Sequence, residues 1–131
     1  PIPVEGETSE PGDQHHGEVL DSAATLSRVE GDTELLAEMV RLFLEDCPRL
    51  ISAVREALTR RAPQALQRAA HTLKGSVANF AAQSAFEAAL RLEMMGRQGD
   101  LREAEEAYEA LQQEIERLKP ALADLRREVA A

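Results

Sequence analysis

Apolar side chains recur every three or four residues along most of this 131-residue chain. Toward the end of the chain the step alternates strictly between three and four residues, through Leu101, Ala104, Tyr108, Leu111, Ile115 and Leu118. Because an α-helix turns once in about 3.6 residues, this spacing puts the apolar side chains on one helix face. No segment alternates with the two-residue period of a half-buried strand. The pattern predicts an all-α protein.

Prolines, glycines and capping residues divide the pattern into helices. The expected helices cover about residues 22–29, 33–60, 63–80, 83–98 and 100–118. Pro48 should stop or kink the second helix, and Pro120 should interrupt the last one. Gly96 and Gly99 should close the fourth helix, and Asp100 should cap the start of the fifth.

Long helices with short connections and one apolar stripe each predict an antiparallel four-helix bundle with a short additional N-terminal helix. Residues 1–19 carry Pro, Gly and acids with few apolar side chains, so we expect a flexible acidic linker there. The bundle should span residues 20–120, and residues 121–131 should form a frayed helical tail. We expect a monomer, although the regular spacing of the last helix also fits a coiled-coil seam.

Charge and composition exclude several classes of function. A net charge of −9 argues against nucleic acid as a partner, and no apolar run approaches the length of a membrane span, so we expect no direct membrane contact. The single cysteine, Cys47, excludes an intramolecular disulfide and fits the cytoplasm. The acids are unevenly spread, because the 30 residues between Glu56 and Glu87 contain none. That stretch carries four basic residues: Arg60, Arg61, Arg68 and Lys74.

The sequence AHTLKGS, residues 70–76, lies inside this locally basic stretch. On a helical projection His71 points roughly 150° away from the core face, with Gln67, Arg68, Gly75 and Ala78 on or near its side. Glycine in an exposed helix costs roughly 1 kcal/mol relative to alanine, which favours a surface cleared for the close approach of another protein. Lys74 is one turn from the imidazole, and a phosphoryl group is a cargo that needs both a nucleophilic nitrogen and a nearby cation.

Glu93 falls on the flank of the apolar face of the fourth expected helix, where a carboxylate needs a partner. In an antiparallel pair it would lie near His71. A hydrogen bond from the imidazole Nδ1–H to Glu93 would leave Nε2 as the nucleophile. An ion pair of Glu93 with Arg68 or Arg97 agrees equally well with helical geometry.

The sequence AAHTLKGSVANFAA resembles the signature of histidine-containing phosphotransfer (HPt) domains. The similarity extends over about residues 20–120, including FLEDCPRLISAVREAL before the motif and RLEMMGRQGDL after it. It implies a four-helix-bundle core in which His71 is phosphorylated on Nε2 and exchanges the phosphoryl group with an aspartate of a response-regulator receiver domain.

The resemblance also implies roles for the neighbouring residues. Lys74 would be the cation near the phosphoryl group, Gly75 the cleared docking surface and Glu93 the hydrogen-bond partner of the histidine. Gln67, Arg68, Ala78 and Arg97 are further candidates for phosphoryl or docking contacts. Ala81 departs from the family, which commonly has glycine there, and this leaves the end of the third helix open.

The same resemblance implies that this domain holds no cofactor or metal, because the receiver partner binds the Mg²⁺. The chain has no ATP-binding loop, so we expect a phosphotransfer intermediate and no autonomous enzyme. A histidine kinase would be a separate protein or part of the same parent chain, as in a hybrid sensor kinase, with this domain in the cytoplasm. The alternative is a non-catalytic helical adaptor or dimerisation bundle in which His71 is incidental.

Overall fold

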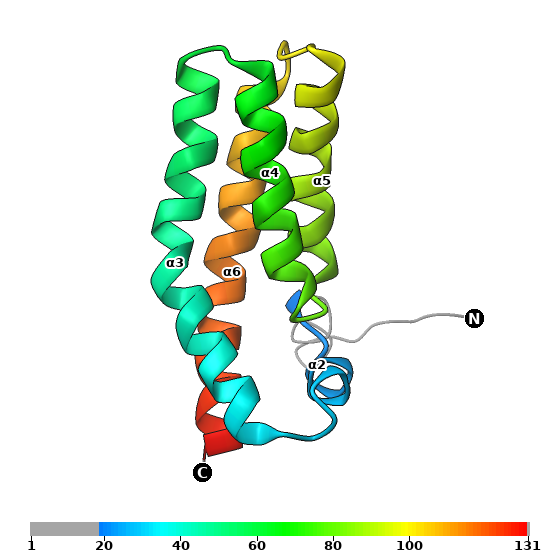
Figure 1. Cartoon of the computed structure of the whole chain (residues 1–131), viewed down its shortest axis with the longest axis vertical. Coiled ribbons are helices and arrows are strands. Elements are labelled where there is room, and N and C mark those ends of the chain that lie inside the picture. Colours follow the sequence, from blue (N-terminus) through cyan, green and yellow to red (C-terminus); the bar gives the residue numbers. More distant parts are fainter. Residues whose placement is uncertain (1–18, 131) are drawn as a thin grey trace, which may run out of the picture.

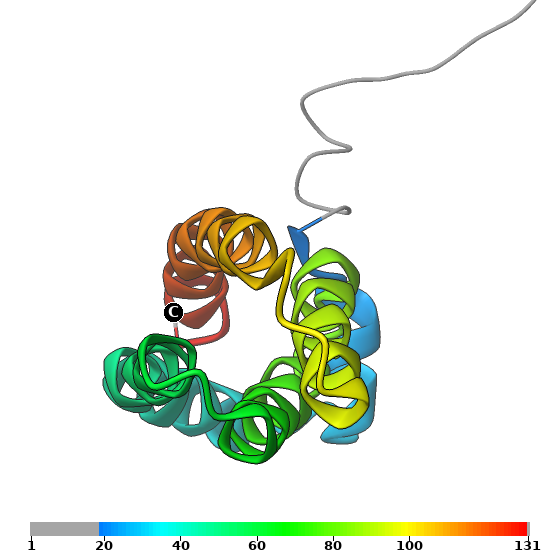
Figure 2. The same ribbon diagram turned by 90° about the horizontal axis from the view of Figure 1, so that it is seen from above.

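The computed structural model describes residues 19–130, and four long helices in this range run alternately up and down (Figure 1). The helices are α2 (Ser22–Arg28), α3 (Thr33–Thr59), α4 (Pro63–Ala78), α5 (Gln83–Gln98) and α6 (Ala104–Ala130). Each long helix packs on two others, in the order α3, α4, α5, α6 and back to α3, so the four close a ring around the core (Figure 2). The all-α bundle with a short N-terminal helix is confirmed. The linker expected over residues 1–19 lies, apart from Val19, outside the described residues.

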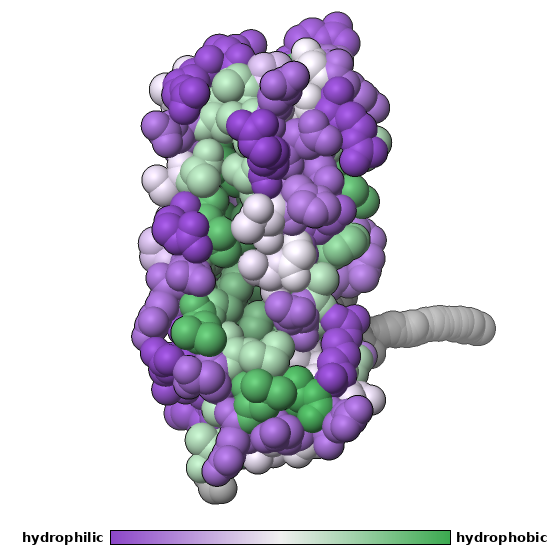
Figure 3. Space-filling view, viewed as in Figure 1, coloured by the Kyte–Doolittle hydropathy of each residue, from purple (hydrophilic) through white to green (hydrophobic). Residues whose placement is uncertain are grey.

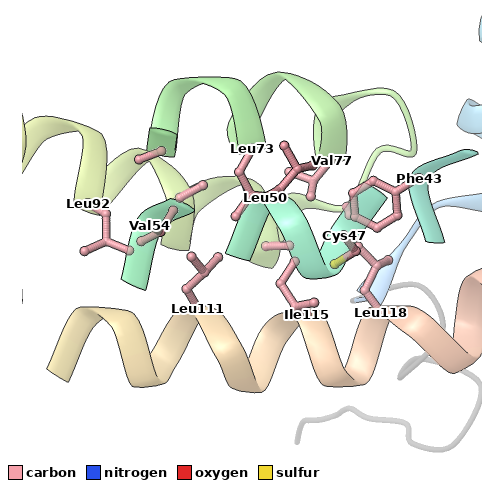
Figure 4. Close-up of a cluster of buried hydrophobic side chains, with 14 of the residues drawn as sticks. Phe43, Cys47, Leu50, Val54, Leu73, Val77, Leu92, Leu111, Ile115 and Leu118 are labelled. Carbon is pink, nitrogen blue, oxygen red and sulfur yellow. The ribbon is translucent and has the colours of Figure 1, made fainter. Parts of the chain in front are cut away.

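The core is aliphatic and lies between the four long helices. Figure 4 shows side chains from every long helix pointing into it. The labelled residues are Phe43, Cys47, Leu50, Val54, Leu73, Val77, Leu92, Leu111, Ile115 and Leu118, and all are buried. Each large side chain that is removed from water in this way contributes about 1.5–3 kcal/mol to the stability of the fold. This burial is the main reason why the helices keep their relative rotation.

The expectation for Pro48 is only partly right. Pro48 does not stop the helix, because α3 continues from Thr33 to Thr59, although Figure 1 shows its first part inclined to the rest. A proline inside a helix removes one backbone hydrogen bond and costs about 3 kcal/mol. Cys47 and Leu50 on either side are both buried, so tertiary packing holds the helix together across the missing bond.

The interruption expected at Pro120 is wrong, and residues 121–130, for which we expected a frayed tail, belong to the same helix. Helix α6 continues through Pro120 to Ala130, and Leu122 and Leu125 are buried in the core. The helix persists because apolar side chains on both sides of the proline, including Leu118, are buried where α6 packs on α3 and α5.

Asp100 does not cap the last helix, which begins four residues later, at Ala104. Its carboxylate accepts hydrogen bonds from the backbone N–H and the guanidinium of Arg102, and these contacts lower the pKa of Asp100 to about 2. Asp100 therefore stabilises the turn between α5 and α6.

Helix α2 lies against the C-terminal end of α4 and satisfies backbone carbonyls there. The buried hydroxyl of Thr25 lies 2.7 Å from the carbonyl oxygen of Phe80, and the guanidinium of Arg28 donates to the carbonyl of Ala78. Ala81 has a φ of 52°, a left-handed conformation that favours glycine. The departure at Ala81 therefore adds a conformational cost to this turn.

Candidate functional site

Helix α4 holds His71 on the outer surface of the bundle. Leu66, Ala70, Leu73 and Val77 on the same helix are completely buried. His71 points away from them, and 66% of its side chain is exposed. The predicted facing of the histidine is confirmed.

Helix α5 brings Glu93 to the back of the imidazole. The Glu93 side chain is only 4% exposed, and its Oε2 lies 2.9 Å from His71 Nδ1. Burial alone would raise the pKa of Glu93, but the contacts with Lys74 and His71 outweigh it and hold the pKa below its usual value. The carboxyl group is therefore ionised at neutral pH and can only accept a hydrogen bond. Nδ1 must then carry a proton, and Nε2 of the neutral ring keeps a free lone pair.

Lys74 pairs with Glu93, a contact that was not expected from the sequence. Its Nζ is 2.8 Å from Glu93 Oε1, so the two groups form an ion pair. The Lys74 side chain is only 20% exposed, and its ammonium lies 5.7 Å from the ring centroid of Phe86. Lys74 thus neutralises the buried carboxylate through Oε1, whereas the imidazole contacts Oε2.

Arg97 gives Glu93 a third partner. Its Nη2 lies 3.7 Å from Glu93 Oε2, and 57% of its side chain is exposed. The sequence left open whether Glu93 pairs with His71 or with an arginine. The structure contains both contacts at once, and within residues 19–130 Arg68 and Glu93 form no ion pair.

An open groove of about 600 Å³ lies beside His71. Its lining residues are Gln64, Gln67, Arg68, His71, Thr72, Glu93 and Arg97. The exposed charges along the groove are the two arginines, whereas its one acid, Glu93, is buried. The groove therefore favours an anion in front of the imidazole.

The remaining sequence candidates lie farther along α4. A Cβ on Gly75 would meet no atom within 4 Å, so this part of the helix is open to an approaching surface. Ala78 is half-buried, and its carbonyl accepts from Arg28 of α2. The structure thus brings Gln67, Arg68 and Arg97 together with the histidine and places Gly75 and Ala78 outside the groove.

Residues 19–130 contain no group of three or more His, Cys, Asp or Glu side chains that could hold a metal ion. Nor does any helix in that range combine the length and apolarity needed to cross a membrane.

Comparison with known proteins assigns the chain to a family. The profile of the Hpt domain matches residues 38–121, which include most of α3, all of α4 and α5, and more than half of α6. No curated protein and no solved structure matches the chain. Hpt domains are phosphotransfer intermediates, not autonomous enzymes. The chain therefore belongs to the Hpt domain family and acts in histidine phosphotransfer within a phosphorelay.

Proposed function

We propose that His71 carries the phosphoryl group of this Hpt domain and exchanges it with an aspartate of a response-regulator receiver domain. The hydrogen bond between His71 Nδ1 and the buried, ionised Glu93 carries this proposal, because it leaves Nε2 as the unprotonated nitrogen of an exposed ring. His71 is also the only histidine in the range 38–121 that matches the family.

In the forward step the Nε2 lone pair of His71 forms a bond to the phosphorus of the receiver's aspartyl phosphate. The bond between phosphorus and the aspartate oxygen breaks, and the aspartate leaves as a carboxylate with the electron pair. The imidazole becomes positively charged and keeps its proton on Nδ1. The Glu93 carboxylate at 2.9 Å stabilises this charge, and its position needs no rearrangement during the step. Donation to a second receiver is the same step reversed.

The basic residues divide the electrostatic work. Lys74 holds Glu93 ionised and adds positive potential behind the ring. Arg97 and Arg68 line the groove, so their guanidinium groups can contact phosphoryl oxygens directly. The side-chain amide N–H of Gln67 can donate a hydrogen bond to the same oxygens.

The receiver docks over α4 and the neighbouring part of α3 in this proposal. Gly75 leaves open space on α4, and 46% of Leu42 on α3 is exposed. Leu42 and Ser76 line a small groove of about 190 Å³. Figure 3 shows apolar surface between α3 and α4, bordered by hydrophilic side chains. Docking against small and apolar side chains lets the receiver's active site approach the imidazole.

Phosphotransfer through His71 requires a receiver domain and a source of phosphoryl groups. The receiver's acidic pocket supplies the Mg²⁺ that neutralises the phosphoryl group during transfer, and this domain contributes no metal ligand or cofactor. A histidine kinase, separate or in the same parent chain, starts the relay. We place the reaction in the cytoplasm with the domain as a monomer.

Transfer of labelled phosphate from phosphorylated receiver domains tests the proposal. Wild-type chain should take up an acid-labile, alkali-stable label in the presence of Mg²⁺, and His71→Gln should take up none. The matched control is the double variant His15→Gln, His16→Gln, which removes the other two histidines and should be labelled like wild type.

Two results would overturn the proposal. Label that persists in His71→Gln would place the phosphoryl group on another residue. A wild-type chain that no receiver labels, together with self-association through α6, would favour the adaptor bundle.

A further inference from the structure

Helices α4 and α5 approach so closely at Gly96 that no side chain fits between them. A Cβ added to Gly96 would lie 2.6 Å from the backbone nitrogen of Gln67 and 2.6 Å from the carbonyl oxygen of Pro63. It would also lie 2.9 Å from the Cα of Gln67. All three atoms belong to the backbone of α4, so no side-chain rotation can make room.

This use of Gly96 differs from the one expected from the sequence. Gly96 does not close α5, because the helix ends at Gln98 and Gly99 adopts the left-handed conformation with a φ of 73°. Gly96 is inside the helix and buried. The other glycine inside a described helix, Gly75, has no atom within 4 Å of an added Cβ. Of these two, only Gly96 is required by packing.

The close approach lies one turn from the functional pair. Gln67 precedes His71 by four residues on α4, and Gly96 follows Glu93 by three residues on the antiparallel α5. The contact between Gln67 and Gly96 and the hydrogen bond between His71 and Glu93 are therefore successive contacts along the same helix pair. A change in helix separation at the first contact is transmitted to the second.

The size of that change follows from the distances. A Cβ that begins at 2.6 Å must move to at least 3.4 Å to reach ordinary van der Waals contact, a separation of about 0.8 Å. The same separation would lengthen the 2.9 Å contact between Nδ1 and Oε2 to about 3.7 Å, beyond hydrogen-bond range.

We infer that Gly96 is a positioning residue for phosphotransfer, because its missing side chain sets the distance at which Glu93 holds Nδ1 of His71. This inference rests on the proposed function of His71. Gly96 touches neither the ring nor the phosphoryl group, and it acts through Glu93 alone. Glycine at this position makes α5 less stable than alanine would, but it allows closer contact between α4 and α5.

The first test reads the imidazole directly, without any phosphotransfer. In ¹⁵N-labelled wild type at neutral pH, the His71 ring should show a protonated Nδ1 and an unprotonated Nε2. Gly96→Ala should lose this single tautomer and show exchange of the proton between both nitrogens. Ile115→Val and Leu118→Ala are controls for lost stability, because both alter buried positions on α6 away from the site. Both controls should keep the wild-type ring signals.

The second test is a double-mutant cycle on the rate of transfer from a phosphorylated receiver. Gly96→Ala should slow transfer by about tenfold to a hundredfold, as expected for sub-ångström to ångström misplacement at a reacting group. In a Glu93→Ala background the same substitution should change the rate by less than about twofold, because the group through which it acts is gone.

Three results would overturn the inference. These are wild-type ring signals in Gly96→Ala, an equal loss of rate in both backgrounds, or a Gly96→Ala chain that circular dichroism shows to be unfolded even with stabilising sulfate. The last would make Gly96 a folding requirement only. A wild-type chain that accepts no phosphoryl group would refute the proposed function instead, and the ring signals would still decide the role of Gly96.

Discussion

Replacing Glu93 with glutamine should lower the free energy of unfolding at neutral pH. It should also remove part of the loss of that free energy in acid. Glutamine matches the shape of glutamate but has no charge, so Lys74 loses the ion-pair partner 2.8 Å away. Breaking a fully buried pair costs about 3–5 kcal/mol, and exposed pairs contribute about 0–1 kcal/mol. Lys74 is 20% exposed and His71 is 66% exposed. We therefore expect a loss of about 1–3 kcal/mol at pH 7.

The pH dependence has a definite sign. The pKa of Glu93 is lower in the folded chain than its ordinary value of 4.5. The stabilisation by Glu93 is thus complete above that ordinary value and is lost as the pH falls through the lower folded pKa. The deficit of Glu93→Gln relative to wild type should be greatest at pH 7 and should shrink in acid.

Urea unfolding followed by circular dichroism at several pH values between 7 and 3 measures this difference. Glu106→Gln is the matched control, because the Glu106 side chain is 76% exposed and lies 3.7 Å from Arg91. It should cost no more than about 0.5 kcal/mol. Equal losses for the two variants at pH 7, or a Glu93→Gln deficit that stays constant down to pH 3, would refute the reasoning.

Three further predictions concern the turn after α4, the end of α6 and the groove. Ala81→Gly should raise the free energy of unfolding by about 0.5–1 kcal/mol, because φ at this position is 52°; an unchanged urea midpoint would contradict this. Leu122→Ala should lower the free energy of unfolding by about 2–5 kcal/mol, because the side chain is completely buried, whereas a frayed tail would give almost no loss. Arg68→Gln should slow transfer mainly at low salt, where charges act over longer distances. Arg127→Gln, at the end of α6, serves as its control, and equal slowing in both variants at every salt concentration would exclude steering by the groove.

The elements that sequence reasoning located well are those set by local chemistry. Pro63 begins α4 and Gly99 follows the last residue of α5, as expected from the conformations that each residue favours. The outward facing of His71 followed from the helical period alone. The residues of α4 that recur at core spacing are all apolar, and His71 lies on the other side of the helix. Local signals of this kind need no knowledge of the partner helix.

The misread features depend on tertiary packing. Pro48 and Pro120 lie inside helices because buried residues on both sides hold the backbone across the missing hydrogen bond. The packing role of Gly96 is set by the distance between two helices, which no local signal reports. The ion pair between Lys74 and Glu93 depends on the relative rotation of α4 and α5. Lys74 lies near the core-side edge of its helix, and that position was the one available signal.

Direct observation of the phosphorylated nitrogen tests the central claim best. The ring nitrogens of ¹⁵N-labelled wild-type chain would be followed by NMR before and after transfer from a phosphorylated receiver domain. We predict that the Nε2 resonance of His71 shifts and couples to phosphorus, while Nδ1 keeps its proton against Glu93. A phosphoryl group on Nδ1, on His15 or on His16 would contradict the account.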